Sequence, residues 1–172
     1  MSPAHLGQFL RDGTRNGLRI ERLLRHPPAR VWKAITESSS LSAWLPVDLV
    51  GERRVGAPLS MPFWPEVVER FEQADQTYEG EVLAWDPPKV FAWTWGGDEI
   101  RFELVEVPEG TRLLFTTWFG PAPVEPWQAA AGWHECLGLL ILLLDQGSAP
   151  GAATSEGSRW EAAYRALFEA GE

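Results

Sequence analysis

The sequence has few of the residues that carry reactive chemistry. Cys136 is the only cysteine among 172 residues, so an internal disulfide is impossible and a reducing compartment fits. The histidines are His5, His26 and His134. In the run from His134 to Cys136, the side chains lack the i, i+4 spacing that lets two helical residues share a metal. We therefore expect no metal site, and we expect Cys136 to be a small buried thiol.

Catalytic and cofactor-binding motifs are also missing. There is no G-x-S-x-G elbow, no phosphate-binding loop and no dinucleotide fingerprint. The sequence accordingly predicts no catalytic residue and no cofactor. A binding protein is favoured over an enzyme, although an enzyme remains the main alternative.

Cations and long apolar runs are scarce too. Lys and Arg total 15 against 24 Asp and Glu, a formal charge of −9, which argues against a nucleic-acid partner and an anionic membrane surface. The longest apolar run, Leu139 to Leu144, is far below the roughly 20 residues that span a bilayer. Met1 to Gly17 contains no apolar core of signal-peptide length. These features predict a soluble cytoplasmic protein that is not inserted in a membrane.

Aromatic residues and strand patterns are abundant instead. Ten tryptophans are present, and the stretch from Tyr78 to Phe119 is typical of four antiparallel strands joined by three turns. The turns are Asp86 to Lys89, Gly96-Gly97 and Val107 to Gly110. A Gly-Gly pair between alternating runs favours a tight hairpin, because both central residues of that turn need positive φ.

Turn lengths fix which residues face each other. The Gly96-Gly97 turn places Phe91 opposite Phe102, and the next turn places Phe102 opposite Phe115. The Asp-Pro-Pro-Lys turn places Ala84 opposite Phe91. All three turns agree on one apolar face, whose members are Tyr78, Gly80, Val82, Ala84, Phe91, Trp93, Trp95, Ile100, Phe102, Leu104, Leu113, Phe115, Thr117 and Phe119. The other face collects the polar residues Glu79, Glu81, Thr94, Glu99, Arg101, Glu103, Arg112 and Thr116, together with Trp85 and Trp118.

The remaining segments complete a single domain over residues 1–172 with its core at 17–147. We expect a frayed arm at 1–16, and strands at 17–25, 47–54 and 57–64. We expect helices at 29–36, 38–44 and 127–146, a segment of helical character at 65–76, a flexible connector at 148–158 and a closing helix at 159–170. The long helix is apolar on both sides, which predicts that either the closing helix or a second subunit covers it.

A strand, two short helices, a run of antiparallel strands and a long C-terminal helix make an α+β helix-grip arrangement. Its motifs are residues 27–36, Leu41 to Leu45, Gly80 to Leu83 with 86–88, Trp93-Thr94-Trp95, Gly110 to Leu113 and Gly132-Trp133. In their order and spacing, these motifs resemble the START-like (SRPBCC) superfamily, in the group named after the C-terminal domain of the heat-shock chaperone ATPase activator. The resemblance covers roughly Gly17 to Gly147.

The resemblance implies a curved sheet wrapped around the long helix, with an apolar cavity between them. Relatives bind lipids, sterols, polyketides or other hydrophobic molecules, and some act as cyclases or hydrolases. It therefore implies a hydrophobic small molecule, lipid-like, aromatic or polycyclic, as the partner bound in this cavity. A cyclase or hydrolase using the same cavity is one alternative, and a module that binds a chaperone or another protein is a second.

We expect the ligand to be bound from two sides. The sheet side comprises Tyr78, Trp93, Trp95, Phe102, Phe115 and Thr117, and the opposite side comprises Trp44, Trp133 and Leu137. The Thr117 hydroxyl either bonds a neighbouring backbone group or orients the ligand, since such sites use few polar groups. Asp98 either shapes its turn or acts as an acceptor at the rim, and Arg22 either reaches water at an edge or lies at the pocket mouth.

Overall fold

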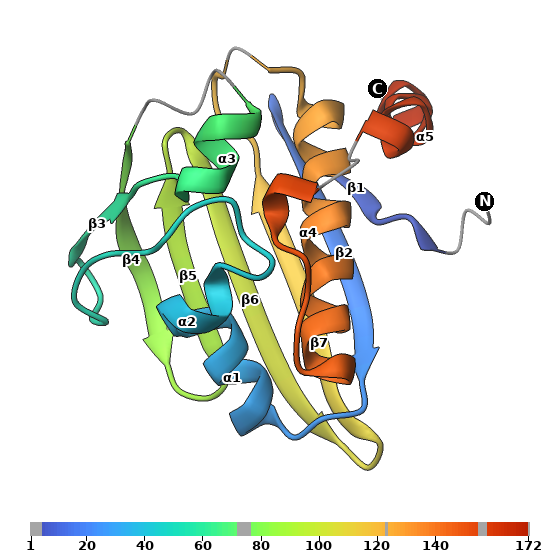
Figure 1. Cartoon of the computed structure of the whole chain (residues 1–172). Helices are drawn as coiled ribbons and strands as arrows, with labels where there is room; N and C mark the ends of the chain where they lie inside the picture. Colours follow the sequence, from blue (N-terminus) through green and yellow to red (C-terminus); the bar gives the residue numbers. More distant parts are fainter. Residues whose placement is uncertain (1–4, 72–76, 123, 155–157, 172) are drawn as a thin grey trace.

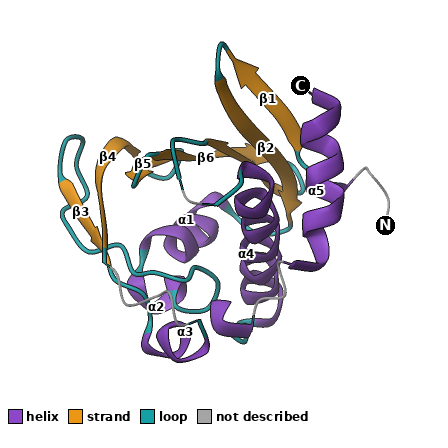
Figure 2. Ribbon diagram, turned by 90° about the horizontal axis from the view of Figure 1, so that it is seen from above, coloured by secondary structure: helices purple, strands orange, loops and turns teal. Residues whose placement is uncertain are grey.

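The computed structural model describes residues 5–71, 77–122, 124–154 and 158–171. Within these ranges, the strands form one antiparallel sheet in the order β1-β2-β7-β6-β5-β4-β3. The sheet curves, and α1 to α4 lie against its concave face (Figure 1 and Figure 2). This arrangement confirms the predicted α+β helix-grip fold.

The helices and strands occur in nearly the predicted order along the chain. The strands are β1 (Gln8–Asp12), β2 (Arg15–Leu24), β3 (Pro58–Met61), β4 (Tyr78–Asp86), β5 (Val90–Trp95), β6 (Asp98–Val107) and β7 (Gly110–Trp118). The helices are α1 (Pro28–Thr36), α2 (Ser38–Leu41), α3 (Pro65–Arg70), α4 (Pro126–Gln146) and α5 (Ser158–Gly171), with a short 3₁₀ turn, η2 (Ala152–Thr154).

The central hairpins have the predicted register on one side of β5 and a different one on the other. Phe91 pairs with Phe102 and Phe102 with Phe115, as the turn lengths predict. Between β4 and β5 the register shifts after Val82, and Phe91 pairs with Trp85 instead of Ala84. The predicted Ala84–Phe91 pair is therefore wrong. A bulge inserts one extra residue and turns the following side chains to the other face.

The bulge also corrects the predicted position of Trp85. Its ring lies 5.0 Å from the ring of Trp32 and 5.2 Å from that of Phe91, centroid to centroid. Both neighbours are buried on the helix-covered side of the sheet. Trp85 therefore lies on the helix-covered side of the sheet and not on the other face, where it was predicted.

The N-terminal arm was expected to be frayed, and for the described residues this is wrong. β1 pairs with β2 through a turn at Gly13, whose φ is +60°. The ring of Phe9 packs on that of Phe168 of α5, with centroids 5.0 Å apart. The hairpin therefore connects the N-terminus to the closing helix, while residues 1–4 of the predicted arm lie outside the described range.

The segment between α2 and α3 contains less strand than predicted. Only Pro58–Met61 forms a strand, and residues 47–54 contribute isolated bridges from Val47 to Phe63 and from Val50 to Ser60. At Gly51, with φ +153°, an added Cβ would lie 2.4 Å from the carbonyl oxygen of Pro58. This close backbone approach interrupts regular pairing. The helical prediction for 65–76 is borne out as far as Arg70, and residues 72–76 lie outside the described range.

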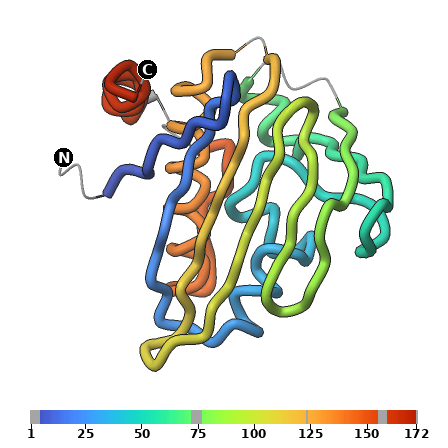
Figure 3. The backbone as a smooth tube through the Cα atoms, turned by 180° about the vertical axis from the view of Figure 1, so that it is seen from behind, coloured from blue at the N-terminus to red at the C-terminus, as the bar shows by residue number. Residues whose placement is uncertain are grey.

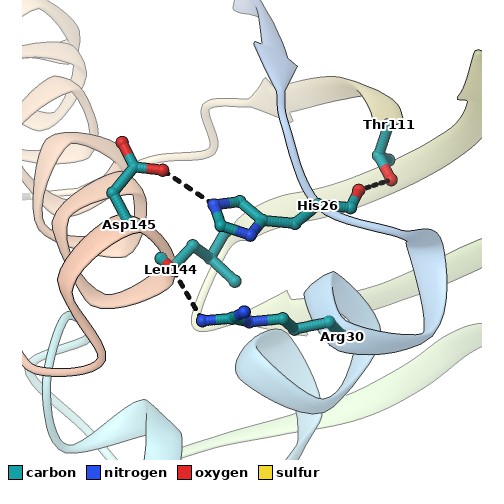
Figure 4. A network of polar contacts seen from close by, with 5 residues as sticks. All are labelled: His26, Arg30, Thr111, Leu144 and Asp145. Carbon is teal, nitrogen blue, oxygen red and sulfur yellow. Dashed lines mark hydrogen bonds and ion pairs between the residues drawn. The ribbon is translucent and has the colours of Figure 1, made fainter. Parts of the chain in front are cut away.

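α4 is held at both ends. Glu125 and Gln128 form a capping box at its start, and Gly147 ends it with φ +77°. Figure 4 shows its last turn, where Nε2 of His26 lies 2.7 Å from Oδ1 of Asp145 and Nη2 of Arg30 donates to the carbonyl of Leu144 at 2.7 Å. The Thr111 hydroxyl donates to the His26 carbonyl at 2.7 Å. These contacts connect the end of α4 to α1 through Arg30 and to the loop after β2 through His26. The bond from Thr111 connects His26 in turn to β7.

The two sides of α4 are covered by different elements. Trp133, Leu137, Leu140 and Leu144 are buried toward the sheet. α5 packs against α4 and β1 at the other side (Figure 2). Seen from behind, α4 lies under β2 and β7 (Figure 3). Packing of the closing helix on α4 confirms the first of the two predicted covers.

The connector after α4 contains ordered contacts. Ala152 of η2 is buried against Val67 of α3. Residues 155–157 of the predicted connector lie outside the described range. α4 itself has 21 residues and is long and apolar enough to cross a membrane by length and composition. In this structure it packs against the sheet and α5 as a core helix, although the short apolar run at 139–144 gave no sign of a helix of this length and hydropathy.

Candidate functional site

The space predicted between the sheet and α4 is filled by aromatic rings. The ring of Trp133 lies 4.6 Å from that of Phe115 and 6.5 Å from that of Phe102, centroid to centroid. Trp93 stacks on Phe102 at 5.8 Å, and Trp44 packs on the edge of Phe102 at 5.9 Å. These rings form a close-packed core, so the predicted gap in front of Trp133 is absent here.

Two polar atoms inside this core are unusual. Trp93 Nε1 and Thr117 Oγ1 are buried and have no hydrogen-bond partner among the described residues. The hydroxyl of Thr117 therefore does not bond a neighbouring backbone group, which was one of its two predicted roles. By contrast, the indole N–H of buried Trp44 donates to the carbonyl of Ala34 at 2.9 Å.

An open cavity of about 410 Å³ lies beside this core, at the end of the sheet where the β5–β6 hairpin meets the first half of α4. We call it the mouth cavity. Its lining residues are Pro46, Phe63, Tyr78, Trp95, Gly96, Gly97, Asp98, Pro121, Ala122, Val124, Ala129, Gly132, Trp133 and Cys136. Most of this lining is apolar, as in typical sites for small molecules, whose volumes run from about 300 to 1,000 Å³.

Two glycines and one carboxylate hold the mouth cavity together. An added Cβ on Gly120 would lie 2.1 Å from the carbonyl oxygen of Gly97, so the backbone after β7 touches the hairpin tip. Beside this contact, Oδ1 of Asp98 accepts the Gly120 N–H at 2.8 Å. Asp98 therefore lies on the rim, where its carboxylate connects the hairpin tip to the backbone after β7, and its role as an acceptor for a ligand stays a prediction.

The aromatic walls meet at steep angles. Phe63 and Tyr78 lie at 67° with centroids 5.9 Å apart, and Tyr78 and Trp95 at 70° and 6.4 Å. Trp95 and Trp133 lie at 87° and 5.8 Å. Each pair is edge to face, so consecutive rings present alternating faces and edges around the cavity.

The helix side of the mouth cavity is made of small residues. Ala129, Gly132 and Cys136 come from successive turns of one face of α4. A Cβ added to Gly132 would meet no heavy atom within 4 Å. Burial raises the pKa of the Cys136 thiol to about 12, so it remains protonated and unreactive near neutral pH.

Asp98 is the charged side chain of this lining. Burial raises its pKa, and the hydrogen bond from Gly120 partly opposes that shift. The described residues show no group of three or more His, Cys, Asp or Glu side chains placed to hold a metal ion. The arrangement can therefore bind an apolar body, with one carboxylate available at its edge.

The nine predicted site residues divide between the core and the mouth cavity. Three of them line the mouth cavity: Tyr78, Trp95 and Trp133. Six pack within the buried core: Trp44, Trp93, Phe102, Phe115, Thr117 and Leu137. Sequence reasoning missed Phe63, Ala129, Gly132 and Cys136. The signal for two of them was their spacing, because Gly132 and Cys136 are four residues apart and share one face of the helix that contains Trp133.

Arg22 lies away from the mouth cavity. Its guanidinium donates to the carbonyls of His5 at 2.8 Å and Glu21 at 2.9 Å. It lies on β2, which is not an edge strand, and is half-buried, so the predicted position that reaches water at an edge is not observed. A second hollow, of about 500 Å³, lies between α1 and the β4–β5 turn beside Trp32 and Trp85.

Comparison with known proteins places the fold. A family model described as Activator of Hsp90 ATPase homolog 1-like protein matches residues 25–145. No protein of curated function matches the chain significantly. Solved structures below 25% identity match it in fold along most of its length.

Three of these structures illustrate the range of similarity. Conserved protein of unknown function EF2215 from Enterococcus faecalis has a TM-score of 0.79 and 20% identity, over 96% of this chain and 92% of its own. CalU16 from Micromonospora echinospora, solved by NMR, has a TM-score of 0.71 and 18% sequence identity over the whole of both chains. Protein MLL2253 from Mesorhizobium loti has a TM-score of 0.61 and 24% sequence identity. The match covers 76% of this chain and 97% of that protein.

Proposed function

Because the chain belongs to the family of Activator of Hsp90 ATPase homolog 1-like proteins, we propose that it binds a hydrophobic small molecule, and that the ligand lies in the mouth cavity. The family and the fold support a ligand-binding domain in general terms. The observation that carries the specific proposal is the cavity of about 410 Å³ walled by Phe63, Tyr78, Trp95 and Trp133.

Burial of apolar surface supplies the affinity in this proposal. Aromatic walls and small helix residues give apolar contact on several sides, and burial contributes about 25 cal/mol per Å² of apolar surface. The core rings behind Trp133 hold that wall in place, because Phe115 packs directly against it. The cavity is thus preformed, which reduces the entropy lost on binding.

A pair of glycine substitutions in α4 tests the proposal. Gly132 lines the mouth cavity, whereas Gly138 is exposed on the same helix, and an added Cβ meets no heavy atom within 4 Å at either position. Gly132→Leu should therefore place its side chain in the cavity, because the Cβ position is open. Gly138→Leu makes the same chemical change outside it and serves as the matched control.

The measurement is a fluorescence titration with N-phenyl-1-naphthylamine, a neutral apolar probe. Wild type and Gly138→Leu should show saturable binding with equal affinity, and Gly132→Leu should bind at least tenfold more weakly. Equal binding by all three proteins would place the ligand elsewhere. The absence of saturable binding to wild type would contradict the proposal itself.

A further inference from the structure

The mouth cavity combines steeply angled aromatic rings with a single kind of charge. Tyr78 presents its ring at 67° to Phe63 and at 70° to Trp95. Asp98 lies on the same rim, and no Lys, Arg or His is among the described lining residues. A ring that turns its face toward the cavity offers a negative π surface to a positive charge beside the carboxylate.

The carboxylate lies at the same end as two of these rings. Asp98 pairs directly with Trp95 across the two-residue turn. In that turn, a Cβ added to Gly96 would lie 3.7 Å from the Tyr78 ring. Tyr78, Trp95 and Asp98 therefore surround the hairpin tip. The small residues of α4 form the opposite, uncharged wall.

One carboxylate oxygen is already engaged. Oδ1 of Asp98 accepts the Gly120 N–H at 2.8 Å, and this bond fixes the orientation of the group. No cation lies within 4.0 Å of Asp98 among the described residues, whereas the adjacent Glu99 pairs with Arg15 at 3.0 Å. A positively charged ligand group would supply the counter-charge that the chain does not place there.

We propose that the ligand of the mouth cavity carries a cationic amine, of tertiary or quaternary ammonium type, on its apolar body. The ammonium group lies against the rings of Tyr78 and Trp95 and beside Asp98, and the apolar body lies toward Trp133 and Gly132. This inference rests on the proposed function, because it assigns the chemistry of the ligand bound at that same site. Burial raises the pKa of Asp98, and a cation bound beside it would oppose that shift by favouring the ionised carboxylate.

An anionic ligand is disfavoured by the same geometry. A carboxylate or phosphate in the mouth cavity would approach Asp98 without a described basic side chain to compensate it. A neutral ligand would gain the apolar contacts alone, and charge is therefore the property to vary in the test.

The experiment compares choline with 3,3-dimethylbutan-1-ol, which has the same shape and no charge. Binding to each is followed by NMR titration of the tryptophan indole signals. Wild type should bind choline at least fivefold more tightly than 3,3-dimethylbutan-1-ol. It should bind benzyltrimethylammonium, which adds an apolar ring, more tightly than choline. Asp98→Asn keeps an oxygen for the Gly120 N–H and should lose the preference for the cation.

Two further variants separate the site from general attraction by an acidic protein. Glu99→Gln removes one negative charge from the next residue, outside the mouth cavity, and should retain the full preference. Tyr78→Leu removes one aromatic wall and should weaken the binding of choline more than the binding of 3,3-dimethylbutan-1-ol. A similar loss in Glu99→Gln and Asp98→Asn would overturn the assignment to this site.

The outcomes distinguish this inference from the proposed function. If wild type binds N-phenyl-1-naphthylamine but treats choline and 3,3-dimethylbutan-1-ol alike, the cation proposal is wrong and the apolar site stands. If the neutral alcohol binds more tightly, the cation proposal is also wrong. If wild type binds none of these probes, both proposals fail.

Discussion

The rings of Phe115 and Trp133 pack with their centroids 4.6 Å apart and connect β7 to α4. This contact fills the centre of the fold that the apolar face of the sheet would otherwise leave open. It also displaces the available space to the mouth cavity, where the other side of Trp133 meets Trp95. The division between a filled core and an open mouth follows from this one pair.

Phe115→Ala should therefore be strongly destabilising. Phe115 is fully buried, and removing its ring leaves a cavity between the sheet and Trp133 that costs about 3–5 kcal/mol of unfolding free energy. Phe71→Ala, at a position 41% exposed, is the control and should change stability by less than about 0.5 kcal/mol. Chemical denaturation measures both. Equal effects would mean that the core contact is not formed in solution.

Two threonines of β7 give opposite expectations for the same substitution. Both are fully buried, but Thr111 donates to the His26 carbonyl at 2.7 Å whereas Thr117 Oγ1 has no partner among the described residues. Thr117→Val should raise the unfolding free energy by about 1 kcal/mol, since it removes an unsatisfied hydroxyl, and Thr111→Val should lower it by about 1–2 kcal/mol. A loss of stability in Thr117→Val would reveal a hydrogen-bond partner for its hydroxyl.

His134 predicts a loss of stability on acidification. It is buried beneath α5, where its Nδ1 lies 2.8 Å from the Tyr164 hydroxyl and its ring packs on that of Trp160 at 3.9 Å. Burial, reinforced by the positive charge of Arg22, lowers its pKa from 6.5 to about 4. Glu135 opposes this shift, while Arg159 and His5 add to it.

The sign of the effect follows from proton binding. Between pH 6.5 and about 4 the unfolded chain binds a proton at this histidine and the folded chain does not, so stability falls as the pH falls through that window. Denaturation curves at several pH values should show a smaller slope in His134→Gln than in wild type. Identical slopes would contradict the burial of a neutral His134.

The last turn of α4 provides another prediction. Arg30 donates to the Leu144 carbonyl, one of the groups left without a partner at a helix end (Figure 4). Arg30→Ala should cost about 1 kcal/mol of unfolding free energy and speed hydrogen exchange in the last turn. Substitution of the exposed Arg25 by alanine serves as control and should leave exchange in that turn unchanged.

The glycines of α4 also predict a gain in stability. Gly132 and Gly138 lie in the helix interior, where an added side chain meets open space. Each substitution by leucine should raise the unfolding free energy by about 0.5–1 kcal/mol, because leucine is the better helix former. Thermal unfolding measures this gain. A destabilised Gly132→Leu would mean that the mouth cavity is already closed by a neighbouring group.

Much of the fold could be predicted because turn chemistry is local. The Gly96-Gly97 turn fixed the pairing of Phe91 with Phe102, although of the two glycines only Gly96 has the expected positive φ. The predicted helix at 127–146 differs from α4 by one residue at its start. The bulge before Ala84 has no local signal, so the position of Trp85 was wrong. The β1 hairpin was missed because its polar sequence acquires a buried side only when Phe9 meets α5.

The site was harder to predict because an apolar face does not reveal whether its rings meet a partner. Sequence alone placed Phe102 and Phe115 on the correct face, and tertiary packing then buried them against Trp133. Tyr78 and Trp95 remain in the mouth cavity because the hairpin tip extends past the packed core. The ligand, a second subunit, a chaperone partner and a cytoplasmic location stay predictions.

The most direct test of this account is to locate a bound apolar probe by NMR. On addition of N-phenyl-1-naphthylamine, the largest shifts should occur at the amides of Gly96 and Gly132 and the indoles of Trp95 and Trp133, which surround the mouth cavity. Shifts centred instead on the hollow beside Trp32 and Trp85 would contradict the account.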